Sequence, residues 1–197
     1  MTDSLKRWFD SAADTDQPLE ARLDAIARAI DLATDARNRS GLERADELVE
    51  QVSRGQISPR AAATLAYYRA NIWSAIHTLK SPDAPGIWDW QGEETQQEIL
   101  YLRQAAYHPG FEDIDPVRKC QIDTNLGNLL NRVGRAVDAI ESWNRALARI
   151  PRFAMARGNR GHGLSYYSRA LYDRSHMAMM MLAAHDDLSA TLAACRT

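Results

Sequence analysis

Cysteine is scarce in this sequence, and its two copies are far apart. Cys120 and Cys195 are the only two among 197 residues, and neither belongs to a CxxC pair. A disulfide framework or a zinc site needs several cysteines at short, regular spacings. We therefore expect two reduced thiols in a cytoplasmic protein, with no bound metal and no cofactor.

Long apolar runs and an excess of basic charge are missing as well. The longest apolar stretch covers residues 177–184, whereas a membrane-spanning helix needs about 20 residues. Charged residues are spread through residues 1–14, where a secretory signal would need an apolar run. The formal net charge is -2, which leaves no surplus of basic side chains to neutralise a phosphate backbone. These absences argue against a membrane and against nucleic acid as partners.

Sequence patterns of common active sites are a third absence. The histidines form no HExxH pattern, and the sequence has no GxSxG turn and no glycine-rich phosphate loop. We therefore predict no catalytic residue and expect that the chain is not an enzyme.

The patterns that are present are helical. Hydrophobic residues make up 45% and charged residues 25% of the chain, as in a folded globular protein. Strand-like alternation is nearly absent, and apolar residues recur three or four positions apart, as Leu23, Ile26 and Ile30 do. Three residue pairs predict helix starts through a side-chain cap or a first-turn proline: Ser40 with Glu43, Ser58 with Pro59, and Asp115 with Pro116.

These signals divide the chain into helical hairpins. A short amino-terminal helix precedes four hairpins, and the whole is expected to form a single domain over residues 1–197. The hairpins are predicted at approximately 17–54, 58–108, 115–150 and 153–195.

An internal repeat is visible in the second half of the chain. Gly127 in TNLGN and Gly161 in GNRGH are 34 residues apart. The stretch TNLGNLLNRVGRAVDAIESWNRALARIP resembles the tetratricopeptide repeat, a helical hairpin with this period. The residues that carry the resemblance, at the spacings of that motif, are Leu126, Gly127, Leu130, Gly134, Ala139, Trp143, Ala146 and Pro151.

The resemblance implies an all-α, right-handed superhelical solenoid of about four hairpins, in which neighbouring hairpins bury each other's apolar faces. Gly127 and Ala139 lack bulk and let two helices approach closely, while Trp143 fills the space between hairpins. The function implied is that of a non-catalytic scaffold, which binds a peptide or a partner protein in its concave groove.

A second resemblance concerns residues 158–188. This stretch is similar to a segment of bacterial proteins in which such repeats precede a HEPN domain, a domain often found in ribonucleases of defence or toxin systems. The chain would then be the sensing part of a larger protein, with the active helices beyond Thr197. Arg169 and His176 have the R-x6-H spacing of HEPN ribonucleases, but the residues between them are typical of a turn. We therefore assign them no catalytic role.

Polar and aromatic residues on the first helix of each hairpin are the candidate partner-binding residues, because those helices line the concave face in this family. Asparagine is a poor helix former, so its repetition within one helix calls for an explanation. Its amides could bind the backbone of a peptide, while Arg132 binds a carboxylate; alternatively the asparagines bridge repeats, cap loops or face water. The predicted residues on these helices are Tyr67, Asn71, Thr124, Asn128, Asn131, Arg132, His162 and Tyr166. Trp88 and Trp90 are added from the long interhelix loop 81–92, because tryptophans often anchor interfaces; alternatively both rings fold back onto the second hairpin.

Two further expectations concern substitution and assembly. Replacing Asn128 and Arg132 is expected to weaken partner binding and leave folding almost unaffected. Leu182, Leu188 and Leu192 should form an apolar edge on the last helix, which docks on a downstream domain or a second protomer. A self-associating structural array is therefore a third possible function, beside the scaffold and the nuclease regulator.

Overall fold

All regular structure in the described part of the chain is helical. The computed structural model describes residues 3–80 and 91–195, and no strand occurs within these ranges. The all-α prediction is thereby confirmed. The chain separates into two compact units, Met1–Asp113 and Ile114–Thr197. Whether these units make up a single superhelical domain stays a prediction.

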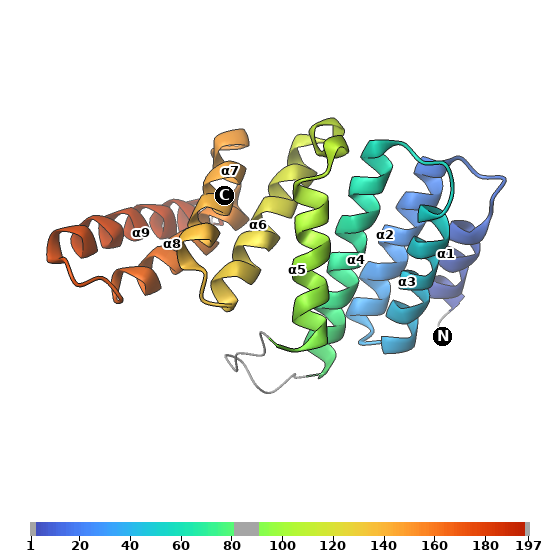
Figure 1. Cartoon of the computed structure of the whole chain (residues 1–197), viewed down its shortest axis with the longest axis horizontal. Coiled ribbons are helices and arrows are strands. Elements are labelled where there is room, and N and C mark those ends of the chain that lie inside the picture. The colour runs from blue at the N-terminus through green and yellow to red at the C-terminus, as the bar shows by residue number, and fades with distance from the viewer. Residues whose placement is uncertain (1–2, 81–90, 196–197) are drawn as a thin grey trace. The chain divides into compact units, whose positions relative to one another are not determined.

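The first unit contains the amino-terminal helix and the two predicted hairpins that follow it. Its helices lie side by side in Figure 1, and α2 contacts α1, α3 and α4. Buried alanines at 25, 29, 33 and 63 allow this close approach, and leucines and isoleucines fill the remaining space. The helices are α1 (Asp3–Ala13), α2 (Leu19–Asp35), α3 (Arg39–Ser53), α4 (Pro59–Lys80), α5 (Glu93–Ala106) and the 3-10 helix η1 (Pro109–Asp113).

The second unit contains the two carboxy-terminal helix pairs. The helices are α6 (Pro116–Arg132), α7 (Ala136–Arg149), α8 (Ala154–Ser168) and α9 (Arg174–Ala194). Helix α6 contacts α7 and α8, and α8 packs along α9. The connection between α6 and α7 turns at Gly134, whose φ of 80° lies in the left-handed region that glycine adopts without steric cost. Gly134, one of the residues that carry the tetratricopeptide resemblance, thus forms the turn between α6 and α7.

Two of the three predicted helix starts are confirmed. Helix α4 begins at Pro59, and the Ser58 hydroxyl accepts a hydrogen bond from the backbone N–H of Ala61, with 3.2 Å between the two heavy atoms. Helix α6 begins at Pro116, and the Asp115 carboxylate accepts from the backbone N–H of Arg118 at 2.9 Å. A side-chain acceptor satisfies one of the free N–H groups of the first turn in both helices.

The third predicted helix start is wrong. Helix α3 begins at Arg39, so Ser40 already lies in its first turn and cannot be the cap. Asn38 is the cap: its side-chain oxygen accepts from the backbone N–H of Gly41 at 3.0 Å, and from the Ser40 hydroxyl at 2.9 Å. The Glu43 carboxylate pairs with the guanidinium of Arg39, at 2.9 Å, in place of the backbone N–H that a capping box would give it. Asparagine two residues before the serine is an equally good cap, and the chain uses it.

The core of the second unit is organised around the indole ring of Trp143, which is 1% exposed. A Cβ atom at Gly127 on α6 would lie 2.6 Å from the indole Nε1, and one at Gly163 on α8 would lie 2.4 Å from the ring atom Cζ3. The ring therefore lies between the backbones of two other helices, and only glycine at each position leaves room for it. The predicted role of Trp143 and Gly127 in packing is confirmed.

Candidate functional site

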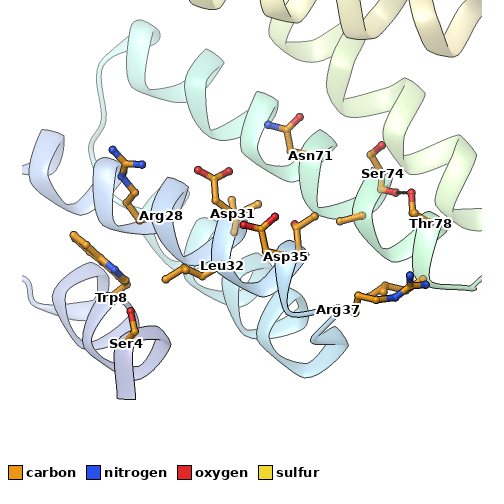
Figure 2. Close-up of a pocket in the computed structure, with 14 residues that line it drawn as sticks. Ser4, Trp8, Arg28, Asp31, Leu32, Asp35, Arg37, Asn71, Ser74 and Thr78 are labelled. Carbon is orange, nitrogen blue, oxygen red and sulfur yellow. Dashed lines mark hydrogen bonds between the residues drawn. The ribbon is translucent and has the colours of Figure 1, made fainter. Parts of the chain in front are cut away.

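A cleft in the first unit brings together polar side chains from three helices. It has a volume of about 1060 Å³ and is lined by residues of α1, α2 and α4 (Figure 2). Ser4 and Trp8 come from α1, and Arg37 follows the end of α2. The other polar lining residues are Arg28, Asp31, Thr34 and Asp35 of α2, and Asn71, Ser74 and Thr78 of α4.

Helical spacing explains why these side chains share one surface. Arg28, Asp31 and Asp35 recur at intervals of three and four residues, which places them on one face of α2. The opposite face of the same helix carries Leu23 and Ile26, which are buried. The amphipathic pattern that packs α2 into the first unit thus also turns a charged stripe toward the cleft.

The charged groups of the cleft lack partners within the described part of the chain. The side chains of Arg28, Asp31, Asp35 and Arg37 make no hydrogen bond and no ion pair to any residue in 3–80 or 91–195. The side-chain amide of Asn71 also has no partner there. Because a polar group gains most from a contact when nothing else already satisfies it, these side chains are available to a ligand.

Arg37 has an unusual backbone conformation. Its φ is 49°, in the left-handed region where glycine is the common residue after a helix. The turn is held by its backbone N–H, which donates to the Thr34 carbonyl at 3.0 Å, and by that of Asn38, which donates to the Ala33 carbonyl at 2.8 Å. Sequence reasoning did not find Arg37, because the residue that signals this turn is normally glycine or asparagine.

A smaller cleft of about 550 Å³ lies elsewhere in the first unit, and Arg69 in its lining already has an ion-pair partner. The guanidinium of Arg69 binds both carboxylate oxygens of Asp46, at 2.8 and 2.9 Å, and lies 4.6 Å from the ring centroid of Tyr101. A bidentate pair of this kind is a strong, geometrically defined interaction. Arg69 therefore links α3 to α4 and is not free for a ligand.

The predicted site residues of the first unit have different surroundings. Asn71 lines the large cleft together with Thr34 of α2. Tyr67, one turn before Asn71, is 4% exposed, and its ring packs 6.4 Å from that of Tyr68. Tyr67 thus belongs to the core and not to a binding surface. Trp88 and Trp90 lie outside the described residues.

In the second unit, two of the predicted residues have structural partners. Thr124 is fully buried, and its hydroxyl donates to the Cys120 carbonyl at 2.6 Å, so it cannot reach a ligand. The side-chain oxygen of Asn128 accepts a hydrogen bond from the indole N–H of Trp143 at 3.0 Å. Of the alternatives open to the asparagines, Asn128 therefore joins two helices of one hairpin.

The other predicted residues of the second unit are accessible. Asn131 is half-buried and Arg132 is exposed at the end of α6. His162 and Tyr166 are exposed on one face of α8, with their ring centroids 5.0 Å apart in an edge-on contact. The Arg169 guanidinium lies 5.4 Å from the Tyr166 ring centroid, and the α8–α9 turn separates Arg169 from His176. Partner binding by these residues stays a prediction.

The last helix carries a row of exposed apolar side chains, as the sequence predicts. Leu182 and Leu192 are each 62% exposed and Leu188 is 38% exposed, whereas only Ala184 and Asp187 of α9 are buried. Asp187 binds the guanidinium of Arg160 at 2.7 and 2.8 Å and so joins α9 to α8.

The described part of the chain has neither a candidate metal site nor a candidate membrane-spanning helix. Within residues 3–80 and 91–195, no group of three or more histidine, cysteine or acidic side chains is placed to hold a metal ion. The helices in these same ranges include none with the length and apolar character to cross a membrane.

The fold and the cleft together define a class: an all-α protein of paired helices with a polar, mixed-charge cleft on one of its two units. Comparison with known proteins does not narrow this class, because neither a protein-family model nor a curated protein sequence matches the chain.

Proposed function

We propose that this chain is a non-catalytic scaffold that binds a segment of a partner protein in the cleft between α1, α2 and α4. The observation that carries the proposal is the set of unpartnered polar groups in this cleft, centred on Asn71. An amide offers both a donor and an acceptor, which suits the peptide backbone. The described lining residues include no histidine, cysteine or lysine.

The resemblance of residues 124–151 to the tetratricopeptide repeat supports the same proposal. Repeats of that family provide a surface and no chemistry, and Thr34 and Asn71 line one cleft as first-helix residues of successive hairpins should. The proposal retains the right-handed superhelix, the cytoplasmic location and the bacterial source as expectations. It also extends the binding surface to Asn131, Arg132, His162 and Tyr166.

Site-specific photocrosslinking of the full chain tests the proposal. A photoreactive amino acid at Thr78, an exposed lining residue of α4, should crosslink a specific protein in a cell extract. The control carries the same group at Glu47, which is exposed on α3 and does not line the cleft.

The partner identified at Thr78 is then purified, and its affinity is measured by calorimetry against wild type and Asn71→Ala. We expect binding that weakens about three- to tenfold in the variant, as for one hydrogen bond. Equal crosslinking at the two positions, or an affinity that Asn71→Ala leaves unchanged, would show that the partner does not use this cleft.

The exposed leucines of α9 favour a second role, self-association through that helix. A contiguous apolar surface on a folded protein commonly marks an interface. The sequence predicts that this surface docks on a downstream domain or on a second protomer. The purified protein by itself can test the second protomer. The sedimentation experiment described in the Discussion tests it.

A further inference from the structure

The order of charges along the large cleft is specific enough to name the kind of segment that fits it; this inference rests on the proposed function. Figure 2 shows Asp31 and Asp35 between Arg28 on one side and Arg37 on the other. The sequence of charges along α2 is therefore positive, negative, negative, positive.

The two aspartates form the centre of this pattern. They are four residues apart, so they lie one helical turn, about 6 Å, from each other along α2. Like charges at this spacing repel, and no basic side chain among the described residues forms an ion pair with either aspartate.

Acidic residues of the neighbouring helix α3, in contrast, have ion-pair partners. Glu43, Asp46 and Glu50 are each paired with an arginine, at 2.9, 2.8 and 2.6 Å. Asp31 and Asp35 thus differ from these α3 carboxylates in having no ion-pair partner among the described residues.

The arginines at the two sides add a second condition. A uniformly basic segment would be attracted by Asp31 and Asp35 but repelled by Arg28 and Arg37. A uniformly acidic segment would be attracted by the two arginines but repelled by the two aspartates. Arg37 holds its place in a backbone conformation that costs a residue other than glycine free energy. A glycine there would form the same turn more easily, so the turn alone does not account for the arginine.

We propose that the cleft binds an extended protein segment in which a lysine or arginine is flanked on both sides by acidic residues. The basic side chain would lie between Asp31 and Asp35, with its aliphatic part toward Trp8 or Leu32, and Asn71 would bind the backbone. Arg28 and Arg37 are nine positions apart, roughly 13 Å along a helix axis, which an extended chain covers in about four residues. The acidic residues should therefore lie about two positions from the basic one.

A phage-displayed library of random peptides, selected on the full-length chain, tests this pattern. Peptides recovered on wild type should be enriched in a basic residue with an acidic residue about two positions away on each side. The enrichment of the basic residue should vanish on Asp31→Asn/Asp35→Asn, and that of the acidic residues on Arg28→Gln/Arg37→Gln. Asp24→Asn is the matched control, since Asp24 is exposed on the same helix and does not line the cleft.

Synthetic copies of the selected peptides provide the affinities. We expect binding about tenfold weaker to the double aspartate variant than to wild type or Asp24→Asn, with a further decrease as salt is raised. Thermal melts confirm that each variant is folded.

The outcomes separate the two levels of proposal. Selected peptides that bind more weakly to Asn71→Ala than to wild type, but show no preference for a basic residue, would overturn this inference and keep the proposed function. A selection that yields no peptide dependent on Asn71 would overturn both. A melt that shows Asp31→Asn/Asp35→Asn unfolded would move the affinity test to the single variants, which carry the same expectation at a smaller size.

Discussion

Glycine at position 163 has a role that depends on a residue of another helix. Gly163 belongs to α8, yet a Cβ atom there would meet the Trp143 ring of α7 at 2.4 Å. Sequence reasoning recognised the glycines at 127 and 161 by their spacing but had no reason to single out 163. The ring contact shows that Gly163 is part of the core.

Replacing Gly163 by alanine is therefore expected to destabilise the protein. The added methyl group must displace a ring that is 1% exposed and already held by α6 and α8, and overpacking of this kind costs about 1–3 kcal/mol. Urea denaturation followed by circular dichroism measures the change in the free energy of unfolding.

Gly158→Ala in the same helix is the control for that substitution. Its Cβ would lie 3.3 Å from the methyl group of Thr191, a tight contact but much longer than the 2.4 Å at Gly163, and alanine favours a helix by about 0.5–1 kcal/mol over glycine. Equal destabilisation by both substitutions would mean that any side chain harms α8 and that the ring contact is not the cause.

Replacing Asn128 should affect folding more than the sequence predicts. The expectation that its replacement leaves folding almost unaffected does not agree with its hydrogen bond to the Trp143 indole N–H. Asn128→Ala removes the acceptor, and a buried donor left without a partner costs about 1–3 kcal/mol.

We therefore expect a lower urea midpoint for Asn128→Ala, together with a shift of the tryptophan fluorescence as the indole loses its partner. Asn131→Ala, at a half-buried position three residues on, should change the free energy of unfolding by no more than about 0.5 kcal/mol. If Asn128→Ala were as stable as Asn131→Ala, the hydrogen bond to Trp143 would be energetically silent.

At the scale of helices, the end of α4 and the start of α5 are joined by an ion pair. The Lys80 ammonium lies 3.0 Å from the Glu94 carboxylate, which is buried in the first turn of α5. Burial alone raises the pKa of this carboxyl, but a hydrogen bond from its own backbone N–H and the charge of Lys80 outweigh that effect. The pKa of Glu94 is thus lower in the folded protein than its ordinary value.

A lowered pKa in the folded state has a defined consequence for pH dependence. The unfolded chain binds a proton more readily at this site, so Glu94 contributes stability above the ordinary glutamate pKa of about 4.3. That contribution is lost as the pH falls below this value and through the folded pKa. We expect the difference in the free energy of unfolding between wild type and Glu94→Gln to be full near pH 7 and to shrink below about pH 4.

Chemical denaturation of both proteins across this pH range provides the measurement. Glu47→Gln is the control, because the Glu47 side chain is 67% exposed on α3. A difference between wild type and Glu94→Gln that stays constant from pH 7 to pH 3 would contradict the assignment.

At the scale of the whole molecule, the exposed side of α9 is a candidate surface for self-association. Its exposed leucines leave an apolar surface that a second copy of the chain could cover. Sedimentation velocity of the purified chain over a range of concentrations should then show a monomer–dimer equilibrium. Leu182→Ser/Leu192→Ser should shift that equilibrium to monomer without lowering the melting temperature by more than a few degrees, because both side chains are 62% exposed.

The control for this experiment is Val137→Ser, a substitution of an exposed apolar residue on α7, whose side chain is 54% exposed. It should leave the equilibrium unchanged. Monomeric wild type at the highest concentration would rule out self-association through α9.

The sequence by itself determined those features that depend on residues close together in the chain. Apolar residues at intervals of three and four specify helices, and the starts at Ser58–Pro59 and Asp115–Pro116 follow because a cap and a first-turn proline act within one turn. The error at Ser40 came from the same local rules, since Asn38 and Ser40 are both good caps and only one can begin α3. The close packing of Gly127 and Trp143 was also predictable, through the spacing of the repeat.

Only the tertiary structure decided which polar residues are free to bind. Asn71 and Asn128 were both predicted to bind a partner, yet Asn71 lines a cleft without a partner among the described residues, and Asn128 accepts a hydrogen bond from the indole of Trp143. Thr124 was predicted to bind and is buried. The physical reason is that a hydrogen bond to a residue on another helix depends on how the two helices pack, which local spacing does not specify. The charge order of the large cleft became visible for the same reason, because the left-handed turn at Arg37 adds a charge that the helical pattern of α2 does not contain.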